Sequence, residues 1–127
     1  MNSAELESYG FINWYLMSGQ LLSSVPAHPG VYVMKVNQSF GRYKGNSDIL
    51  YIGRTTCVKS GLRGRIRQYF HPGVTQITNI RINKLLVSKV EIYISFIVYE
   101  LPKELEKKLL EQYYIDHIDL PPQNRQA

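Results

Sequence analysis

The chain has 127 residues, of which 44% are hydrophobic and 20% charged, and its formal net charge is +5. These values are ordinary for a soluble globular protein of one domain. The single cysteine, Cys57, excludes an internal disulfide, and no apolar run approaches the roughly 20 residues that span a bilayer. Because Glu5 and Glu7 precede any Lys or Arg, the N-terminus is unlike a signal peptide. We therefore expect a cytoplasmic protein, or a nuclear one in a eukaryote.

The N-terminal segment is predicted to be helical over residues 3–22. Its apolar side chains recur at near-helical spacing from Leu6 to Leu16. We therefore expect an N-terminal helical extension over residues 1–25, followed by the main domain over residues 26–127.

Two short strands are predicted next. Residues 23–30 hold two prolines and a glycine, which is typical of a connector. The β-branched, apolar run Val31–Val36 predicts one strand, and residues 49–52 predict another. Residues 37–48 between them are polar and glycine-rich and are predicted to be a loop or hairpin tip. Because this connection is too short for a helical crossover, the two strands are expected to be antiparallel.

The second half is predicted to hold three helices and a third strand. Apolar spacing predicts the helices over residues 60–70, 76–87 and 103–118. Residues 90–100 are apolar on both faces, as in a central strand. The order α-β-β-α-α-β-α predicts an α/β chain of the α+β sandwich type, with a small, mainly antiparallel three-stranded sheet flanked by helices.

Cations are concentrated in the middle of the chain. No acidic residue lies between Asp48 and Glu91, whereas that interval holds eight cations: Arg54, Lys59, Arg63, Arg65, Arg67, Arg81, Lys84 and Lys89. Such a tract predicts a positive face, which would attract a phosphate backbone or an anionic membrane. The alternative is a solvated surface that happens to be basic.

Several familiar sites are excluded. No glycine-rich phosphate loop with a lysine precedes a helix. The single cysteine and the three histidines, His28, His71 and His117, do not form a zinc pattern. His28 and His71 are candidates for touching DNA, with a structural or surface role as the alternative.

Four side chains stand out. Tyr32 opens the first predicted strand and Tyr51 lies near the end of the second, so their phenols could meet on one face of the sheet, although each alone could be an ordinary sheet aromatic. Arg65 lies one turn before Tyr69 and could point along the sheet or into solvent. Glu111 lies between apolar positions of the last predicted helix, where a carboxylate needs a partner. Glu104 and Glu106, which lie among lysines in the first turns of that helix, are interpreted as solvated or capping charges.

These residues together resemble a known family. Gly30-Val31-Tyr32, Tyr51-Ile52-Gly53 followed by a cation, Arg65-x-x-x-Tyr69-Phe70, Glu111 and Asn124 occur in the order that is typical of GIY-YIG nucleases. The resemblance covers roughly residues 29–126 and is closest to phage-encoded and restriction-type single-domain members.

The resemblance implies a role for each matching residue. Tyr32 and Tyr51 would orient or deprotonate the attacking water, and which of them takes the proton stays open. Arg54 matches the cation that follows the second tripeptide, and Arg65 matches the helix arginine that stabilises charge on the scissile phosphate, with Arg63 as a rival for that arginine. Both Arg54 and Arg65 are candidates for favouring a phenolate. The remaining matches are Tyr69, the metal-binding carboxylate Glu111, which would hold one Mg²⁺ or Mn²⁺, and Asn124, which would brace the site.

The implied activity is hydrolysis of DNA phosphodiester bonds by a metal-dependent endonuclease. Eight side chains are predicted to contact DNA: Arg42, Lys44, Lys59, Arg63, Arg67, His71, Arg81 and Lys84. Duplex cleavage by one site per chain would need sequential nicking, a homodimer or a higher oligomer, and the N-terminal segment with Trp14 and Tyr15 is a candidate contact. The alternatives are a catalytically silent nucleic-acid-binding module of the same fold and a ribonuclease variant.

Overall fold

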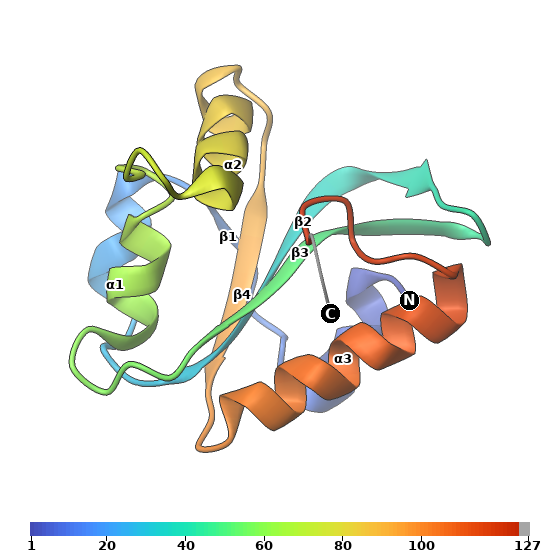
Figure 1. Ribbon diagram of the computed structural model, residues 1–127, viewed down its shortest axis with the longest axis horizontal. Helices are drawn as coiled ribbons and strands as arrows, with labels where there is room; N and C mark the ends of the chain where they lie inside the picture. Colours follow the sequence, from blue (N-terminus) through green and yellow to red (C-terminus); the bar gives the residue numbers. More distant parts are fainter. Residues whose placement is uncertain (125–127) are drawn as a thin grey trace.

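The computed structural model describes residues 1–124, which form a four-stranded antiparallel sheet with helical segments on both faces (Figure 1). The predicted domain over residues 26–127 and the family resemblance to residue 126 both end outside the described residues. In chain order the elements are η1 (Ser3–Tyr9), β1 (Tyr15–Leu16), η2 (Gly19–Ser24), β2 (Gly30–Gly41), β3 (Asn46–Thr55), α1 (Gly61–Arg67), α2 (Ile77–Val87), β4 (Tyr93–Val98) and α3 (Pro102–His117).

The strand order is β1-β4-β2-β3, and each neighbouring pair is antiparallel. The predicted combination of helices with a mainly antiparallel sheet is confirmed. The predicted number of three strands is wrong, because β1 adds a fourth by pairing with β4. None of the helices in residues 1–124 has the length and hydrophobicity needed to cross a membrane.

The predicted helix over residues 3–22 is wrong. The segment forms two 3₁₀ helices with β1 between them, and the first ends at Gly10, whose φ of 105° is left-handed. Leu6 packs on one face of the sheet, and Leu21 packs on the other. Residues 1–25 therefore contribute to the same core as the rest of the chain.

The two aromatic residues beside β1 also have partners within the chain. Tyr15 stacks on Phe96 with a ring-centroid distance of 5.5 Å. The Lys35 ammonium lies 4.7 Å from the centroid of the Trp14 ring.

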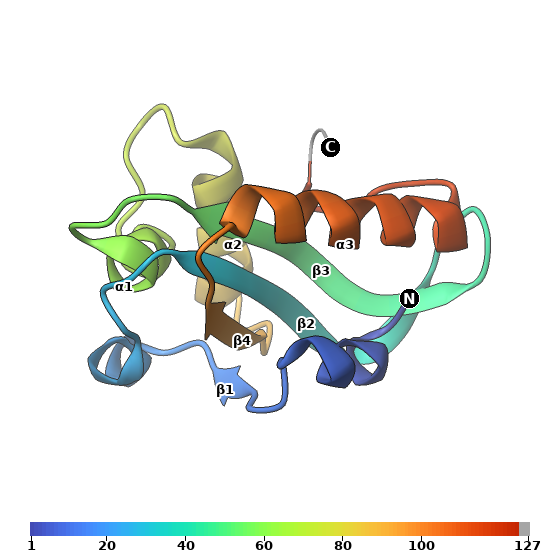
Figure 2. The same cartoon turned by 90° about the horizontal axis from the view of Figure 1, so that it is seen from below.

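Alternation along β2 separates two layers of side chains. Tyr32 and Met34 face α1, whereas Val31 and Val33 face α3. Figure 2 shows α3 running along the sheet near β3, with η1 and β1 toward the other edge. Strand β3 is an edge of the sheet, and both α1 and α3 contact it, from opposite faces.

The hairpin of β2 and β3 is longer than predicted. Most of the predicted loop over residues 37–48 is strand, and only residues 42–45 turn. Met34 pairs with Tyr51 but Lys35 pairs with Ile49, so Leu50 is an extra residue in β3. This bulge places Leu50 and Tyr51 on the same face of the sheet, that of α1.

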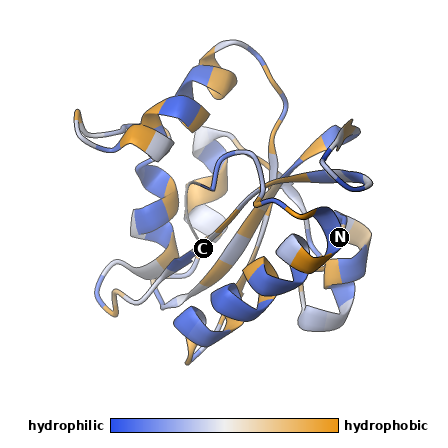
Figure 3. Ribbon diagram, turned by 45° about the vertical axis from the view of Figure 1, so that its right-hand side comes forward, coloured by the Kyte–Doolittle hydropathy of each residue, from blue (hydrophilic) through white to orange (hydrophobic). Residues whose placement is uncertain are grey.

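The elements predicted for the second half are confirmed, with small changes at their ends. Strand β4 lies between β1 and β2, as expected for a strand that is apolar on both faces. Helix α3 begins at Pro102, a residue that suits the first turn of a helix. Hydrophobic residues alternate with hydrophilic ones along α3 (Figure 3), and the buried positions face β2 and β3.

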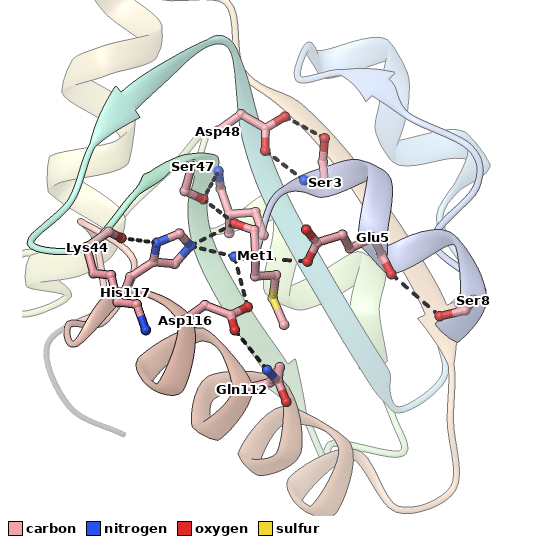
Figure 4. A network of polar contacts seen from close by, with 11 residues as sticks. Met1, Ser3, Glu5, Ser8, Lys44, Ser47, Asp48, Gln112, Asp116 and His117 are labelled. Carbon is pink, nitrogen blue, oxygen red and sulfur yellow. Dashed lines mark hydrogen bonds and ion pairs between the residues drawn. The ribbon is translucent and has the colours of Figure 1, made fainter.

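A polar network attaches the first residues to the end of α3 and to β3 (Figure 4). The Met1 ammonium lies 2.9 Å from a carboxylate oxygen of Asp116 and 2.6 Å from Nε2 of His117. The Ser3 backbone N–H donates to Asp48 over 2.7 Å. Although burial acts in the opposite direction, hydrogen bonds from the Met1 ammonium and Gln112 lower the pKa of Asp116.

Candidate active site

Three tyrosines from different elements meet on the α1 face of the sheet. Tyr32 comes from β2, Tyr51 from β3, and Tyr69 from the turn that follows α1. The Tyr32 and Tyr69 hydroxyl oxygens are 2.5 Å apart, and the Tyr51 ring centroid lies 6.1 Å from that of Tyr32 and 6.4 Å from that of Tyr69. Tyr32 and Tyr69 are completely buried, whereas Tyr51 is partly exposed. The structure thus brings the two predicted motif tyrosines together with Tyr69.

Gly53 makes this approach possible. It pairs with Tyr32 across the hairpin. A Cβ atom at Gly53 would lie 2.5 Å from Cζ of Tyr32 and 2.6 Å from Cε2 of Tyr51, which is too close for any side chain. Gly53, the last residue of Tyr51-Ile52-Gly53, therefore leaves the space that the two phenol rings occupy.

Burial controls the charge of two of the phenols. It raises the pKa of Tyr32 and that of Tyr69 above the usual value near 10, although the positive charge of Arg65 acts to lower both. Burial outweighs the arginine, so both phenols are neutral at pH 7. Tyr51 is the phenol of the three that solvent and a ligand can reach.

Two arginines flank the cluster, one on each side of β3. Arg65 lies on the exposed side of α1, and its charge acts on Tyr32, Tyr69 and Glu106. Arg54 points to the α3 side, where its Nη1 lies 3.5 Å from Oε1 of Glu106. The rival candidate Arg63 donates from Nε to the Val25 carbonyl over 2.8 Å, so its head group is attached to the end of η2.

A cavity of about 270 Å³ lies between β3 and α3 and is lined by Arg54, Lys103, Glu106, Lys107, Leu110 and Glu111. Glu111 is exposed there, and the apolar neighbours that made it conspicuous in the sequence are exposed as well: Tyr114, Ile115 and Ile118 each have at least half of their surface in solvent. The argument that Glu111 needs a partner because of apolar surroundings is therefore wrong. Its place in the cavity is what keeps it a candidate ligand.

The interpretation of Glu106 as a solvated or capping charge is wrong. Only 18% of its side chain is exposed, and it pairs with Arg54. Burial raises the pKa of Glu106, and the charges of Arg54 and Arg65 act to lower it. The helical spacing of the apolar residues could have indicated this burial, because Glu106 lies beside the buried stripe of Leu105, Leu109 and Tyr113.

Asn124 braces the exposed edge of β3. Its carboxamide accepts from the Ile52 N–H over 3.0 Å and donates to the Ile52 carbonyl over 2.8 Å. The Gln123 N–H donates to the carbonyl of the bulged residue Leu50 over 3.1 Å. The C-terminal segment therefore covers the edge on both sides of Tyr51, which protects an otherwise open strand.

Arg42 supports the same segment. Its Nη2 lies 2.7 Å from Oδ2 of Asp119 and 2.6 Å from the Leu120 carbonyl oxygen, and only 13% of its side chain is exposed. Nη2 of Arg42 is engaged within the chain in this arrangement, and the contact of Arg42 with DNA stays a prediction. The pairing spans 77 positions of sequence, so the local pattern did not indicate it.

The other predicted DNA contacts are exposed. Helices α1 and α2 lie together at one end of the molecule (Figure 1), and they or the loops beside them carry most of these side chains. Within residues 1–124 none of the following is in an ion pair: Lys44, Lys59, Arg63, Arg67, His71, Arg81 and Lys84. Their exposure leaves the predicted contact with DNA open to test.

The donor set suits a hard cation that keeps most of its water. In the described part of the chain no group of three or more His, Cys, Asp and Glu side chains lies close enough to enclose a metal ion. Glu106 and Glu111 nevertheless line one cavity. Mg²⁺ is commonly bound by one or two carboxylates, with waters and substrate phosphate oxygens completing its shell, and this cavity offers those carboxylates.

Comparisons of the chain with family models, with curated proteins and with solved structures found no match.

Proposed function

We propose that this protein is a metal-dependent DNA endonuclease of the GIY-YIG type. The observation that carries the proposal is the tyrosine cluster: two buried, hydrogen-bonded phenols and one accessible phenol at a sheet edge, flanked by two arginines. On the other side of the same strand, the cavity holds two carboxylates. Phosphodiester hydrolysis needs these groups, namely a means to orient water, cations for the phosphate charge and a metal ligand.

Each residue has a distinct task in this proposal. Tyr51 orients the attacking water, because it is partly exposed whereas Tyr32 and Tyr69 are completely buried. Arg54 and Arg65 stabilise the negative charge that grows on the phosphate. Glu111 would hold one Mg²⁺ or Mn²⁺, which would supply Lewis-acid stabilisation of the leaving oxygen. Asn124 keeps β3 in place.

DNA is the proposed substrate, and the exposed cations of α1, α2 and their loops would contact its backbone. One site per chain cuts one strand at a time. A nick is therefore the expected first product, and a second strand cut requires a second event or a second copy of the chain.

The test is incubation of the purified protein with supercoiled plasmid, with and without Mg²⁺, beside Glu111→Ala. We expect metal-dependent nicking that Glu111→Ala loses. Glu104→Ala is the matched control, because Glu104 is an exposed acidic residue of α3 that does not line this cavity. Binding without cleavage in any metal would indicate the silent binding module, cleavage of RNA alone would indicate the ribonuclease variant, and equal cleavage by wild type and Glu111→Ala would refute the metal assignment.

A further inference from the structure

The two flanks of α1 carry arginines that face in nearly opposite directions. At about 3.6 residues per turn, Arg65 lies about 160° around the helix from both Arg63 and Arg67. The charge of Arg65 acts on Tyr32, so its flank is that of the proposed site. Nε of Arg63 donates to the Val25 carbonyl, so the other flank is that of η2. Helix α1 therefore lies between two separate positive regions.

The flank toward η2 is hollowed. Figure 2 shows η2 beside α1, and between them lies a cavity of about 500 Å³ lined by Leu22, Ser23, Arg63 and Arg67. A second cavity, of about 320 Å³, lies on the side of α1 that faces away from the sheet and is lined by Ser60, Gly64, Arg67, Gln68 and His71. Because Arg67 borders both cavities, the two adjoin.

No carboxylate neutralises the arginines of this surface. No acidic residue occurs between Asp48 and Glu91, and within residues 1–124 neither Arg63 nor Arg67 is in an ion pair. Like charges four residues apart on a helix repel each other. A phosphate backbone in the cavity would relieve this repulsion.

The width of α1 matches one feature of double-stranded DNA. An α-helix with its side chains is about 10–12 Å across, and the major groove of B-form DNA is about 12 Å wide, whereas the minor groove is about 6 Å wide. A helix in the major groove has one phosphate backbone on each flank. We propose that α1 docks in the major groove of a DNA duplex, with the cleaved strand at Arg65 and the other strand in the cavity between α1 and η2. This inference rests on the proposed nuclease function and adds the groove and the place of each strand.

The proposal separates contact with phosphates from contact with bases. Arg63 and Arg67 bind phosphates of the uncleaved strand, away from the bond that is cut. The cavity at Gly64, which has no side chain, receives the base edges. Gln68 lines that cavity, and glutamine is a residue that can bond two atoms of adenine in the major groove.

Methylation protection tests the groove directly and needs no cleavage. Dimethyl sulfate methylates guanine N7 in the major groove and adenine N3 in the minor groove. The probe is a DNA duplex of two helical turns, about 20 base pairs, saturated with the protein without metal. Methylation of guanine N7 is expected to fall severalfold, while that of adenine N3 stays unchanged. Protection of adenine N3 alone, or of neither atom, would overturn the proposal.

Salt dependence tests the place of the second strand. Arg63→Gln/Arg67→Gln is expected to lower the slope of log affinity against log salt by about two, because each lost phosphate contact removes about one released counterion. The single-turnover rate at saturating DNA is expected to stay within about twofold of wild type, since neither arginine touches the scissile phosphate. Lys108→Gln, at an exposed position of α3, is the control and should change neither quantity. An unchanged slope would overturn the placement, and Arg67→Gln alone, with an expected fall of about one, serves where the double variant folds poorly.

The outcomes distinguish this inference from the nuclease function. Plasmid nicking by a wild type that protects no guanine N7 would overturn the groove and leave the nuclease, whereas protection without nicking in any metal would support the groove and overturn the nuclease. Absence of both binding and nicking would overturn both. Equal affinity for an RNA duplex of the same sequence would also overturn the groove, because the major groove of A-form RNA is too deep and narrow for side chains to read.

Discussion

The buried pair of hydroxyl groups gives the sharpest test of the tyrosine cluster. Tyr32→Phe removes the partner of the Tyr69 hydroxyl, which is buried and has no other hydrogen-bond partner among residues 1–124. A buried polar group left unsatisfied costs about 1–3 kcal/mol. With an unfolding entropy of about 2.1 cal/mol/K per residue, this corresponds to a fall in Tm of about 4–11 °C for 127 residues.

Replacing both tyrosines removes the donor and the acceptor together. The double variant Tyr32→Phe/Tyr69→Phe is therefore expected to lose less stability than the two single variants added together. Urea unfolding of the four proteins measures this coupling, and Tyr43→Phe, at a position that is 84% exposed, is a control expected to change nothing. Losses that add to within about 0.5 kcal/mol would refute the reasoning, because they would mean that the two hydroxyls do not depend on each other.

Three more predictions follow from the same strand edge. Gly53→Ala would place a methyl group 2.5 Å from Tyr32, so we expect a loss of about 1–3 kcal/mol in unfolding free energy, whereas Gly19→Ala, with open space at that position, is the neutral control. Arg42→Ala should speed hydrogen exchange of the Ile52 amide, because it releases the segment that carries Asn124. Lys44→Ala is the control and should leave the exchange rate unchanged. An equal exchange rate in Arg42→Ala and wild type would contradict this role of Arg42. Because the pKa values of Tyr32 and Tyr69 are raised in the folded protein, the unfolded chain releases protons at alkaline pH that the folded chain keeps. The free energy of unfolding should therefore fall as pH rises above about 10, and it should fall less in Tyr32→Phe/Tyr69→Phe. Urea unfolding across alkaline pH measures this dependence, and an equal dependence in the two proteins would contradict the burial of the two phenols.

The middle and the end of the fold could be predicted because their patterns are local. The β-branched run at Val31–Val36 and the apolar strand before Pro102 each contain enough residues to fix the strand type. The N-terminal segment could not be predicted in the same way. Apolar residues between Leu6 and Leu16 fit a helix, but the left-handed Gly10 interrupts it, and β1 forms only through pairing with β4.

The candidate site was predicted in part. The two motif tyrosines lie together, as their strand positions indicated. The bulge at Leu50, which sets the side to which Tyr51 points, depends on register and leaves no mark in the sequence. Arg42 shows the same limit, because its partner Asp119 is distant along the chain. The two glutamates of α3 were assigned incorrect surroundings because the buried face of the helix was not known from the sequence. That face directs Glu106 toward β3, and it leaves the apolar neighbours of Glu111 exposed to solvent.

The three phenols are expected to have different roles because they differ in burial. A phenol gives up its proton near neutral pH only if its anion is stabilised, and the Tyr32–Tyr69 pair lies where burial outweighs the charge of Arg65. That pair is suited to a structural task, because its 2.5 Å hydrogen bond joins β2 to the turn that follows α1. Tyr51 differs because the bulge directs it to the same face while leaving it partly exposed. If the protein activates water through a tyrosine, Tyr51→Phe should therefore reduce the cleavage rate without the loss of stability expected for Tyr32→Phe. Equal loss of stability in both variants would refute this division.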